Sequence, residues 1–100
     1  TVICDPMHGN TYTTKQGIKT RYFDDILEEL HHAFTIHKMS SLPLAGIHFE
    51  VTGGNVTECV GGSCGLQEED LNKTYMSLVD PRLNYSQALE MAHKIATWHR

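Results

Sequence analysis

The sequence has no excess of positive charge and no long hydrophobic run. Eight Lys and Arg face 12 Asp and Glu, which gives a formal net charge of −4 over 100 residues. Nucleic acids and anionic membranes are bound by basic faces, so neither is an expected partner. No stretch approaches the roughly 18 apolar residues of a membrane span, and no charged and then apolar leader opens the chain. A cytoplasmic protein is therefore predicted.

Cysteine is also scarce, with three residues that have neither zinc-finger nor Cys-x-x-Cys spacing. We predict free thiols in a reducing compartment. Three tripeptides of the glycosylation acceptor type leave open an alternative, a secreted α/β domain that carries sugars. The cysteines are Cys4, Cys59 and Cys64, and the acceptor tripeptides begin at Asn55, Asn72 and Asn84.

The composition, 40% hydrophobic and 20% charged, is that of one small folded unit. Three short apolar or β-branched runs end at turn residues, which is typical of buried strands that lead into loops. Apolar side chains between these runs recur with helical spacing. Strands that alternate with helices predict parallel βα units, and Thr1 begins almost inside the first strand, so a segment of a longer chain is expected. The predicted strands are residues 2–3, 47–51 and 76–80, and the predicted helices are residues 21–39, 68–75 and 85–99.

The two long helices have separate signals. Residues 21–39 place apolar side chains at i, i+3, i+4 and i+7, with acidic residues early and basic residues late, which matches the helix dipole. Asn84 and Gln87 have the form of a capping box at the start of the last helix. Residues 9–17 have no period and predict a loop long enough to reach over a site. The predicted apolar stripe of the last helix is Ala88, Leu89, Ala92, Ile95 and Ala96.

One potential metal ligand follows or ends each predicted strand, namely His8, Glu50 and Asp80. Reactive residues of parallel α/β structures gather at the carboxyl ends of the strands. One imidazole and two carboxylates suit Mn²⁺, Fe²⁺, Co²⁺ or Zn²⁺ and leave positions open for a substrate. Each residue also has a simpler interpretation: His8 could cap a strand and Asp80 could form a turn. Glu50 could pair with a cation such as Arg82.

Other charged residues are weaker candidates. Lys19 and Arg21 open the predicted first helix, where the helix N-terminus could help them to hold a phosphate, and the alternative is an ordinary solvated helix start. His37 is expected to be half-buried and His48 to be a packing residue. Solvated helix faces are expected to carry His31, His32, His93 and His99.

Five blocks follow one another along the chain: residues 4–10 (CDPMHGN), 19–24 (KTRYFD), 46–50 (GIHFE), 55–62 (NVTECVGG) and 80–84 (DPRLN). Together they resemble the closing part of type II, plant-like, 3-deoxy-D-arabino-heptulosonate 7-phosphate (DAHP) synthase. The resemblance covers essentially the whole chain. Five blocks in the right order are far more specific than one short motif.

The resemblance implies an α/β fold, a (β/α)8 TIM barrel, of which residues 1–100 would be the last three βα units, about strands 6 to 8. The reaction of the family condenses phosphoenolpyruvate with erythrose 4-phosphate to DAHP and phosphate, the first step of the shikimate pathway toward the aromatic amino acids. The family uses a divalent metal held by a Cys, a His, a Glu and an Asp. The last three map onto His8, Glu50 and Asp80, with Mn²⁺ expected and Co²⁺, Fe²⁺ or Zn²⁺ as alternatives.

This mapping implies roles for single residues. A metal held there would polarise the aldehyde oxygen of the sugar phosphate. His8 and Asp80 would be catalytic, and Asp80 could also orient a sugar hydroxyl or the metal-bound water. Lys19 and Arg21 remain the candidate substrate-binding residues. The full-length protein is expected to be a homo-oligomer in the cytoplasm, or in the plastid of a plant.

The sequence also departs from the family. The Cys ligand and most of the phosphoenolpyruvate-binding Arg and Lys residues belong to earlier strands and have no counterpart here, and Val79 stands where the family often has Cys. A complete barrel needs about 250 residues. The isolated segment is therefore expected to be inactive and to fold poorly or associate. The alternative function is that of a truncated, non-catalytic barrel that acts as a binding or assembly module.

Overall fold

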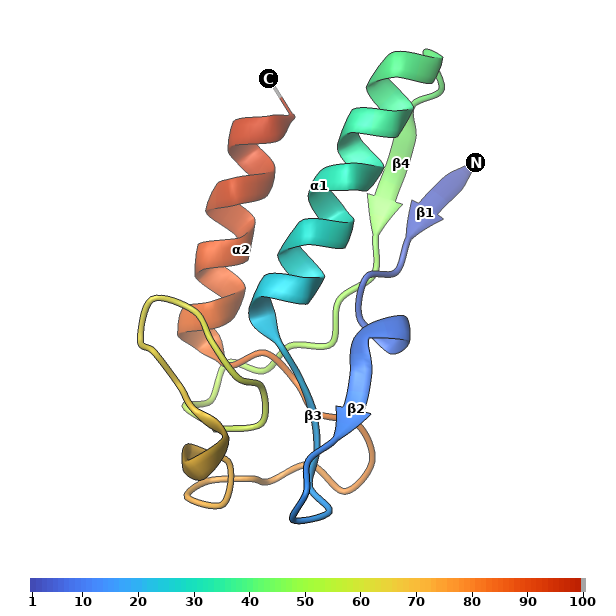
Figure 1. The fold of residues 1–100 in the computed structure, drawn as a ribbon. Coiled ribbons are helices and arrows are strands. Elements are labelled where there is room, and N and C mark those ends of the chain that lie inside the picture. The colour runs from blue at the N-terminus through green and yellow to red at the C-terminus, as the bar shows by residue number, and fades with distance from the viewer. Residues whose placement is uncertain (100) are drawn as a thin grey trace.

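Two parallel strands and two long helices form the regular part of the structure, a computed structural model that describes residues 1–99. Figure 1 shows α1 and α2 side by side, with β1 and β4 next to α1. A hairpin and the long irregular segment between β4 and α2 lie beyond one end of the helices. The elements in order are β1 (Val2–Cys4), the 3-10 turn η1 (His8–Asn10), β2 (Thr11–Thr13), β3 (Lys19–Arg21), α1 (Phe23–Ser40), β4 (Leu44–Ile47), the 3-10 turn η2 (Glu68–Asp70) and α2 (Tyr85–Trp98).

The strands β1 and β4 pair in parallel, with Ile3 opposite Gly46 and Cys4 opposite Ile47. The pairing continues past β4, because the backbone N–H of His48 donates to the carbonyl of Cys4 at 2.8 Å. Since α1 lies between these strands in the sequence and packs against β4, they form one β–α–β unit. The predicted parallel arrangement is therefore confirmed for this pair, and the unit is compatible with part of a barrel. The predicted bounds 47–51 are wrong, because β4 shares only Ile47 with them.

Helix α1 forms where the periodicity predicts it, apart from the first two residues. Phe23, Ile26 and Leu30 are buried along one face. The helix ends at Ser41, which adopts a left-handed conformation (φ 58°) and donates its N–H to the carbonyl of His37. His37 is half-buried, as predicted, and its Nδ1 lies 2.8 Å from the carbonyl oxygen of Leu42, so its ring helps to close the helix end.

Helix α2 begins at the predicted capping box. The Asn84 side chain accepts from the Gln87 N–H at 2.8 Å, and the Gln87 side chain accepts from the Asn84 N–H at 3.0 Å, which satisfies two N–H groups that would otherwise lack partners. The predicted apolar stripe is only partly correct, because the face packed on the core carries Met91 together with Ala88 and Ile95. The stripe members that are exposed instead are Leu89, Ala92 and Ala96.

A hairpin occupies the region predicted as a loop. Strands β2 and β3 pair antiparallel, with Tyr12 opposite Thr20. The sequence shows no apolar alternation here because the strands are short and polar. Lys19 and Arg21 therefore lie on a strand, and the prediction that they open the first helix is wrong: α1 begins at Phe23.

The predicted strand 76–80 is not formed. Parallel pairing instead occurs later, as a single bridge between Val51 and Leu83, in which the Leu83 N–H donates to the carbonyl of Glu50 at 3.0 Å. The physical reason is that Glu58 takes the backbone N–H groups of Met76 and Ser77, so these donors are not available to a strand partner. The predicted helix 68–75 is reduced to the 3-10 turn η2.

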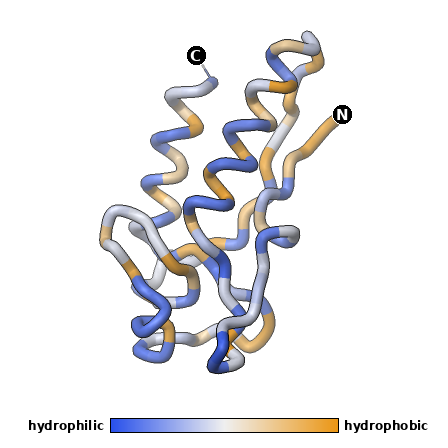
Figure 2. Tube along the Cα trace, viewed as in Figure 1, coloured by the Kyte–Doolittle hydropathy of each residue, from blue (hydrophilic) through white to orange (hydrophobic). Residues whose placement is uncertain are grey.

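The core lies between the helices and the strand ends, where Met7, Phe23, Leu83 and Met91 pack together. Figure 2 shows hydrophobic colour that is continuous along β1 and broken up by hydrophilic positions along both helices. The three cysteines are free thiols among the described residues. Burial raises the pKa of Cys59 to about 12, so its thiol is neutral at physiological pH. Within residues 1–99, no helix combines the length and the apolar character that crossing a membrane requires.

Candidate metal centre

His8 lies in η1, directly after the Asp5-Pro6 turn that ends β1. Its Nδ1 is 2.6 Å from Oδ2 of Asp5. The other ring nitrogen, Nε2, faces two carboxylates: it is 3.2 Å from Oε1 of Glu50 and 3.8 Å from Oδ2 of Asp80. The ring is therefore held on one side and directed toward the two other predicted ligands on its opposite side.

Glu50 follows β4 at the point where the backbone pairs with Leu83. Its side chain is 23% exposed, and its Oε1 lies 2.8 Å from Nη1 of Arg21. The sequence offered Arg82 as a possible partner of Glu50. This partner is wrong, because Arg82 pairs with Glu58. Glu50 thus stands between an imidazole and a guanidinium.

Arg21, which the sequence offered as a candidate substrate-binding residue, is buried beside Glu50. Its side chain is 1% exposed although it carries a charge. Nε donates to Oγ1 of Thr11 and Nη1 donates to the carbonyl of Pro81, both at 2.7 Å. Nη2 is also buried and makes no hydrogen bond within the described part of the chain. A buried cation needs a counterion, and Glu50 supplies it.

Asp80 reaches the site from the irregular segment before the Leu83 bridge. Lys19 Nζ lies 2.6 Å from its Oδ1, and this hydrogen bond lowers the pKa of the carboxyl group below its ordinary value. The backbone carbonyl of Asp80 accepts from Oγ of Ser77 at 2.6 Å. Asp80 therefore presents one oxygen to a lysine and the other toward His8.

The segment that carries Asp80 is held by Glu58, which is fully buried. Its carboxylate accepts from the backbone N–H groups of Met76, Ser77 and Arg82, and also from Nε and Nη2 of Arg82. Burial alone would raise the pKa of Glu58, but the Arg82 side chain and these N–H groups lower it below the ordinary value. The sequence reasoning missed this residue, and its only signal was a carboxylate among the apolar neighbours of residues 56–60.

The donor set fits a divalent metal. One ligand atom each from His8, Glu50 and Asp80 lies within 4.8 Å of the other two. Oε1 of Glu50 is buried and makes no hydrogen bond within the described residues, and it lies between Nη1 of Arg21 at 2.8 Å and Nε2 of His8 at 3.2 Å. One nitrogen and two carboxylate oxygens match the preferences of Mn²⁺, Fe²⁺, Co²⁺ and Zn²⁺. The structure brings together the three residues that the sequence reasoning selected, and their role as ligands remains a prediction.

The structure tests the predicted exposure of the remaining histidines and of one glycosylation tripeptide. His31, His32, His93 and His99 are exposed on or beside the helices, as predicted. His48 is exposed, which corrects the prediction of a packing residue, and its ring centroid lies 5.7 Å from that of His8. Asn84 is 3% exposed and caps α2, so one of the three acceptor tripeptides is inaccessible in this fold.

Comparison with known proteins identifies the family of the chain. Residues 1–96 match the Class-II DAHP synthetase family. A phospho-2-dehydro-3-deoxyheptonate aldolase of Neurospora crassa is 54% identical over 97% of the chain, and proteins with the same name from Streptomyces coelicolor and Streptomyces lividans are 49% and 48% identical over 98% of it. The chain spans 20% of the length of the Neurospora protein, 22% of the S. coelicolor protein and 67% of the S. lividans protein. A match over nearly all of its residues shows that the chain belongs to the Class-II DAHP synthetase family.

Proposed function

We propose that this chain supplies the metal-binding end of a DAHP synthase, an enzyme that condenses phosphoenolpyruvate with erythrose 4-phosphate. The observation that carries the proposal is the approach of His8, Glu50 and Asp80 to within 4.8 Å of one another, in a chain that matches this family over residues 1–96. Relatives of this name catalyse the first step of the shikimate pathway, and the whole reaction would need residues that lie outside this segment.

The three residues would act by holding the metal and orienting the reactants. Nε2 of His8 and one oxygen each of Glu50 and Asp80 would be the ligands, and Mn²⁺ is the expected metal. When bound, the metal supplies Lewis-acid polarisation of the aldehyde carbonyl. The new carbon–carbon bond would join the methylene carbon of phosphoenolpyruvate to the aldehyde carbon, with one water consumed and phosphate released. Asp80, restrained by Lys19, would also orient a sugar hydroxyl.

Lys19 and Arg21 would contribute positive charge for the anionic substrates in different ways. Lys19 is 47% exposed and lies beside Asp80, so its ammonium group can reach a substrate phosphate. Arg21 is buried, and its contacts with Glu50 and Pro81 favour a role beneath the site. Its guanidinium would pair with Glu50 and orient it, and its positive charge would add to the local potential. The TIM barrel, a homo-oligomeric assembly and a cytoplasmic or plastid location are further parts of this proposal.

The test uses a chimera in which residues 1–96 replace the segment that they match in the Neurospora crassa relative. The chimera should bind one divalent metal per chain at this site and form DAHP. In the variant Glu50→Gln, metal affinity and turnover should fall together, because an amide oxygen carries no negative charge. His93→Gln on the exposed face of α2 is the matched control and should change neither. Equal losses in both variants would refute the assignment of the site, and a chimera that binds metal but forms no DAHP would favour the non-catalytic alternative.

A further inference from the structure

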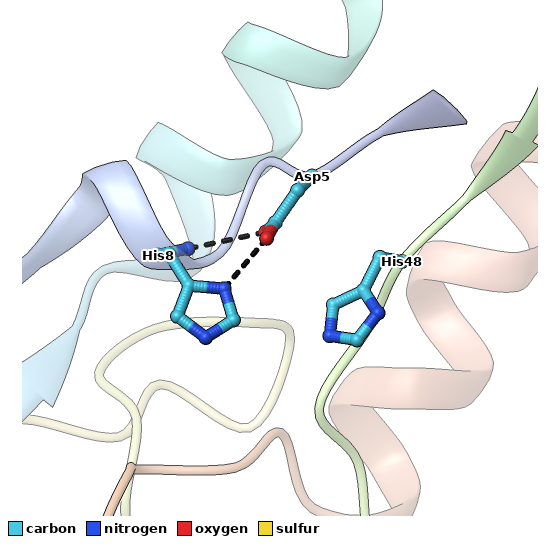
Figure 3. Close-up of side chains that lie close together, drawn as sticks. All are labelled: Asp5, His8 and His48. Atoms are coloured by element: carbon cyan, nitrogen blue, oxygen red, sulfur yellow. Dashed lines mark hydrogen bonds and ion pairs between the residues drawn. The ribbon is translucent and has the colours of Figure 1, made fainter. Parts of the chain in front are cut away.

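Asp5 has contacts that the proposed metal site does not yet explain. It lies one residue past β1 and sends both carboxylate oxygens toward η1 (Figure 3). Oδ1 accepts from the backbone N–H groups of Met7 and His8, at 3.0 and 3.2 Å. Oδ2 lies 2.6 Å from Nδ1 of the His8 ring. The carboxylate is therefore oriented by its own turn before it contacts the imidazole.

A carboxylate at this position decides which ring nitrogen is available. An ionised carboxylate only accepts hydrogen bonds, so the nitrogen that faces Asp5 must carry a proton. A neutral imidazole has one protonated nitrogen, which leaves the lone pair on Nε2. Nε2 is also the nitrogen that faces Glu50 and Asp80, at 3.2 and 3.8 Å. The turn therefore fixes the ring orientation, with Nδ1 toward Asp5 and Nε2 toward Glu50 and Asp80. A metal held between these side chains would take the lone pair of Nε2.

We propose that Asp5 is a positioning residue that holds His8 with its Nδ1 protonated and its Nε2 directed at the metal. This inference rests on the proposed metal site and adds a residue that does not touch the metal or the substrates. Carboxylates that accept from the outer nitrogen of a ligating histidine raise the basicity of the ligand nitrogen, and their loss typically weakens metal binding by 10- to 100-fold.

A second metal site at Asp5, His8 and His48 is the competing interpretation of the same cluster. One ligand atom from each lies within 4.8 Å of the other two, and all three residues are exposed. However, Oδ1 of Asp5 is already used by two backbone N–H groups, and Oδ2 is already used by the ring of His8. Figure 3 shows the same arrangement, with both dashed contacts running from Asp5 to His8 and none to His48. These contacts thus support the orientation of His8.

The variant Asp5→Asn separates this role from a purely structural one. Asparagine keeps Oδ1 as an acceptor for Met7 and His8, so the turn is preserved. It places an NH₂ group, a donor, against Nδ1, which favours the other tautomer with its proton on Nε2. The metal dissociation constant of the chimera, measured by competition with a chelator of known affinity, should rise by about 10- to 100-fold. The melting temperature of the metal-free chimera should stay unchanged, and the visible spectrum of the Co²⁺-loaded protein should change.

The matched control is Asp70→Asn, because Asp70 also accepts from a backbone N–H, that of Gln67, and pairs with a cation, Lys73. This control should leave the dissociation constant and the Co²⁺ spectrum as they are. His48→Gln should also leave them unchanged, and a weakened first metal equivalent in that variant would overturn the proposal in favour of the Asp5–His8–His48 site. Wild-type affinity in Asp5→Asn, with Glu50→Gln weakened, would overturn the role of Asp5 alone. Loss of metal binding in the unmodified chimera would overturn the metal centre itself.

Discussion

The region around the candidate metal centre, here called the polar end, buries charged side chains, whereas the β1–β4 sheet leaves apolar side chains exposed. At the polar end, the charged side chains of Arg21 and Glu58 are buried, and each has partners from segments far away in the sequence. In the sheet, Val2 and Ile3 of β1 are 44% and 62% exposed. Strands of parallel sheets are normally covered on both faces, so the apolar side chains of this sheet are unusually open.

This difference reflects the different free-energy costs of burying a charge and of exposing an apolar side chain. Burying a charged group without a partner costs several kcal/mol of desolvation, and Arg21 and Glu58 are each paired with an opposite charge within this chain. An apolar strand without a neighbour costs less free energy, in proportion to the apolar area that it exposes to water. Residues 5–84 therefore bring the three candidate ligands together, whereas the apolar side chains of β1 remain exposed within the described residues.

The largest expected effect comes from removing the buried cation. Arg21→Met in the chimera keeps most of the side-chain volume but leaves Glu50 without its counterion and Pro81 without its donor. Breaking a buried ion pair on one side typically destabilises by about 3 to 5 kcal/mol. Urea unfolding followed by circular dichroism measures the change. Lys73→Met, which removes an exposed partner of Asp70, should have little effect, and a comparable loss there would contradict the contrast between buried and exposed pairs.

A smaller effect is expected at Glu58. Glu58→Gln retains an acceptor but loses the charge that binds Arg82, and about 1 to 3 kcal/mol of stability should be lost at neutral pH. The pKa of Glu58 is lowered in the folded state, so its contribution is complete above the ordinary value of 4.5 and disappears as the pH falls through the lower folded value. The difference in unfolding free energy between the parent chimera and the variant should therefore shrink below pH 4.5. If the difference in unfolding free energy grows as the pH falls, the pKa of Glu58 is raised by folding and not lowered.

The smallest effect on stability is expected in the sheet. Ile3→Lys places a charge on the exposed part of β1 in the isolated 100-residue chain. Its unfolding free energy should change little, but self-association through the open strand should decrease. Light scattering measures the mass of the parent and the variant, with Lys94→Ile on the exposed part of α2 as the inverse control. If the parent chain is a monodisperse monomer, the exposed strand β1 does not drive self-association and the prediction is wrong.

The helices show how much of the fold can be predicted from local sequence. Helix α1 follows a period that is present in the chain itself, and α2 begins at a capping box whose two bonds join residues three apart. The order of elements also predicted the parallel pairing of β1 with β4. The exposed Leu89 shows the limit of such a pattern, because helical spacing identifies an apolar stripe but not the side from which the core will approach.

The predicted strand at residues 76–80 failed for a different reason. Its composition is suitable for a strand, yet Leu78 and Val79 are 100% and 75% exposed. The backbone N–H groups of Met76 and Ser77 are bound by the carboxylate of Glu58, which is 18 or more residues earlier in the chain. A local pattern contains no information about such an acceptor, so the competing side chain could not be foreseen.

The sequence alone selected His8, Glu50 and Asp80 as candidate ligands and predicted the parallel βα arrangement that positions the first two, because motif blocks and hydrophobic spacing are local properties. Only the tertiary structure decided that Arg21 rather than Arg82 faces Glu50, and that Nε2 of His8 faces Glu50 and Asp80. The physical reason is that an ion pair depends on which segments meet in space and on how deeply they are buried. Those quantities arise only when the chain has folded, since Coulomb attraction and desolvation act through distance and surroundings and not through sequence separation.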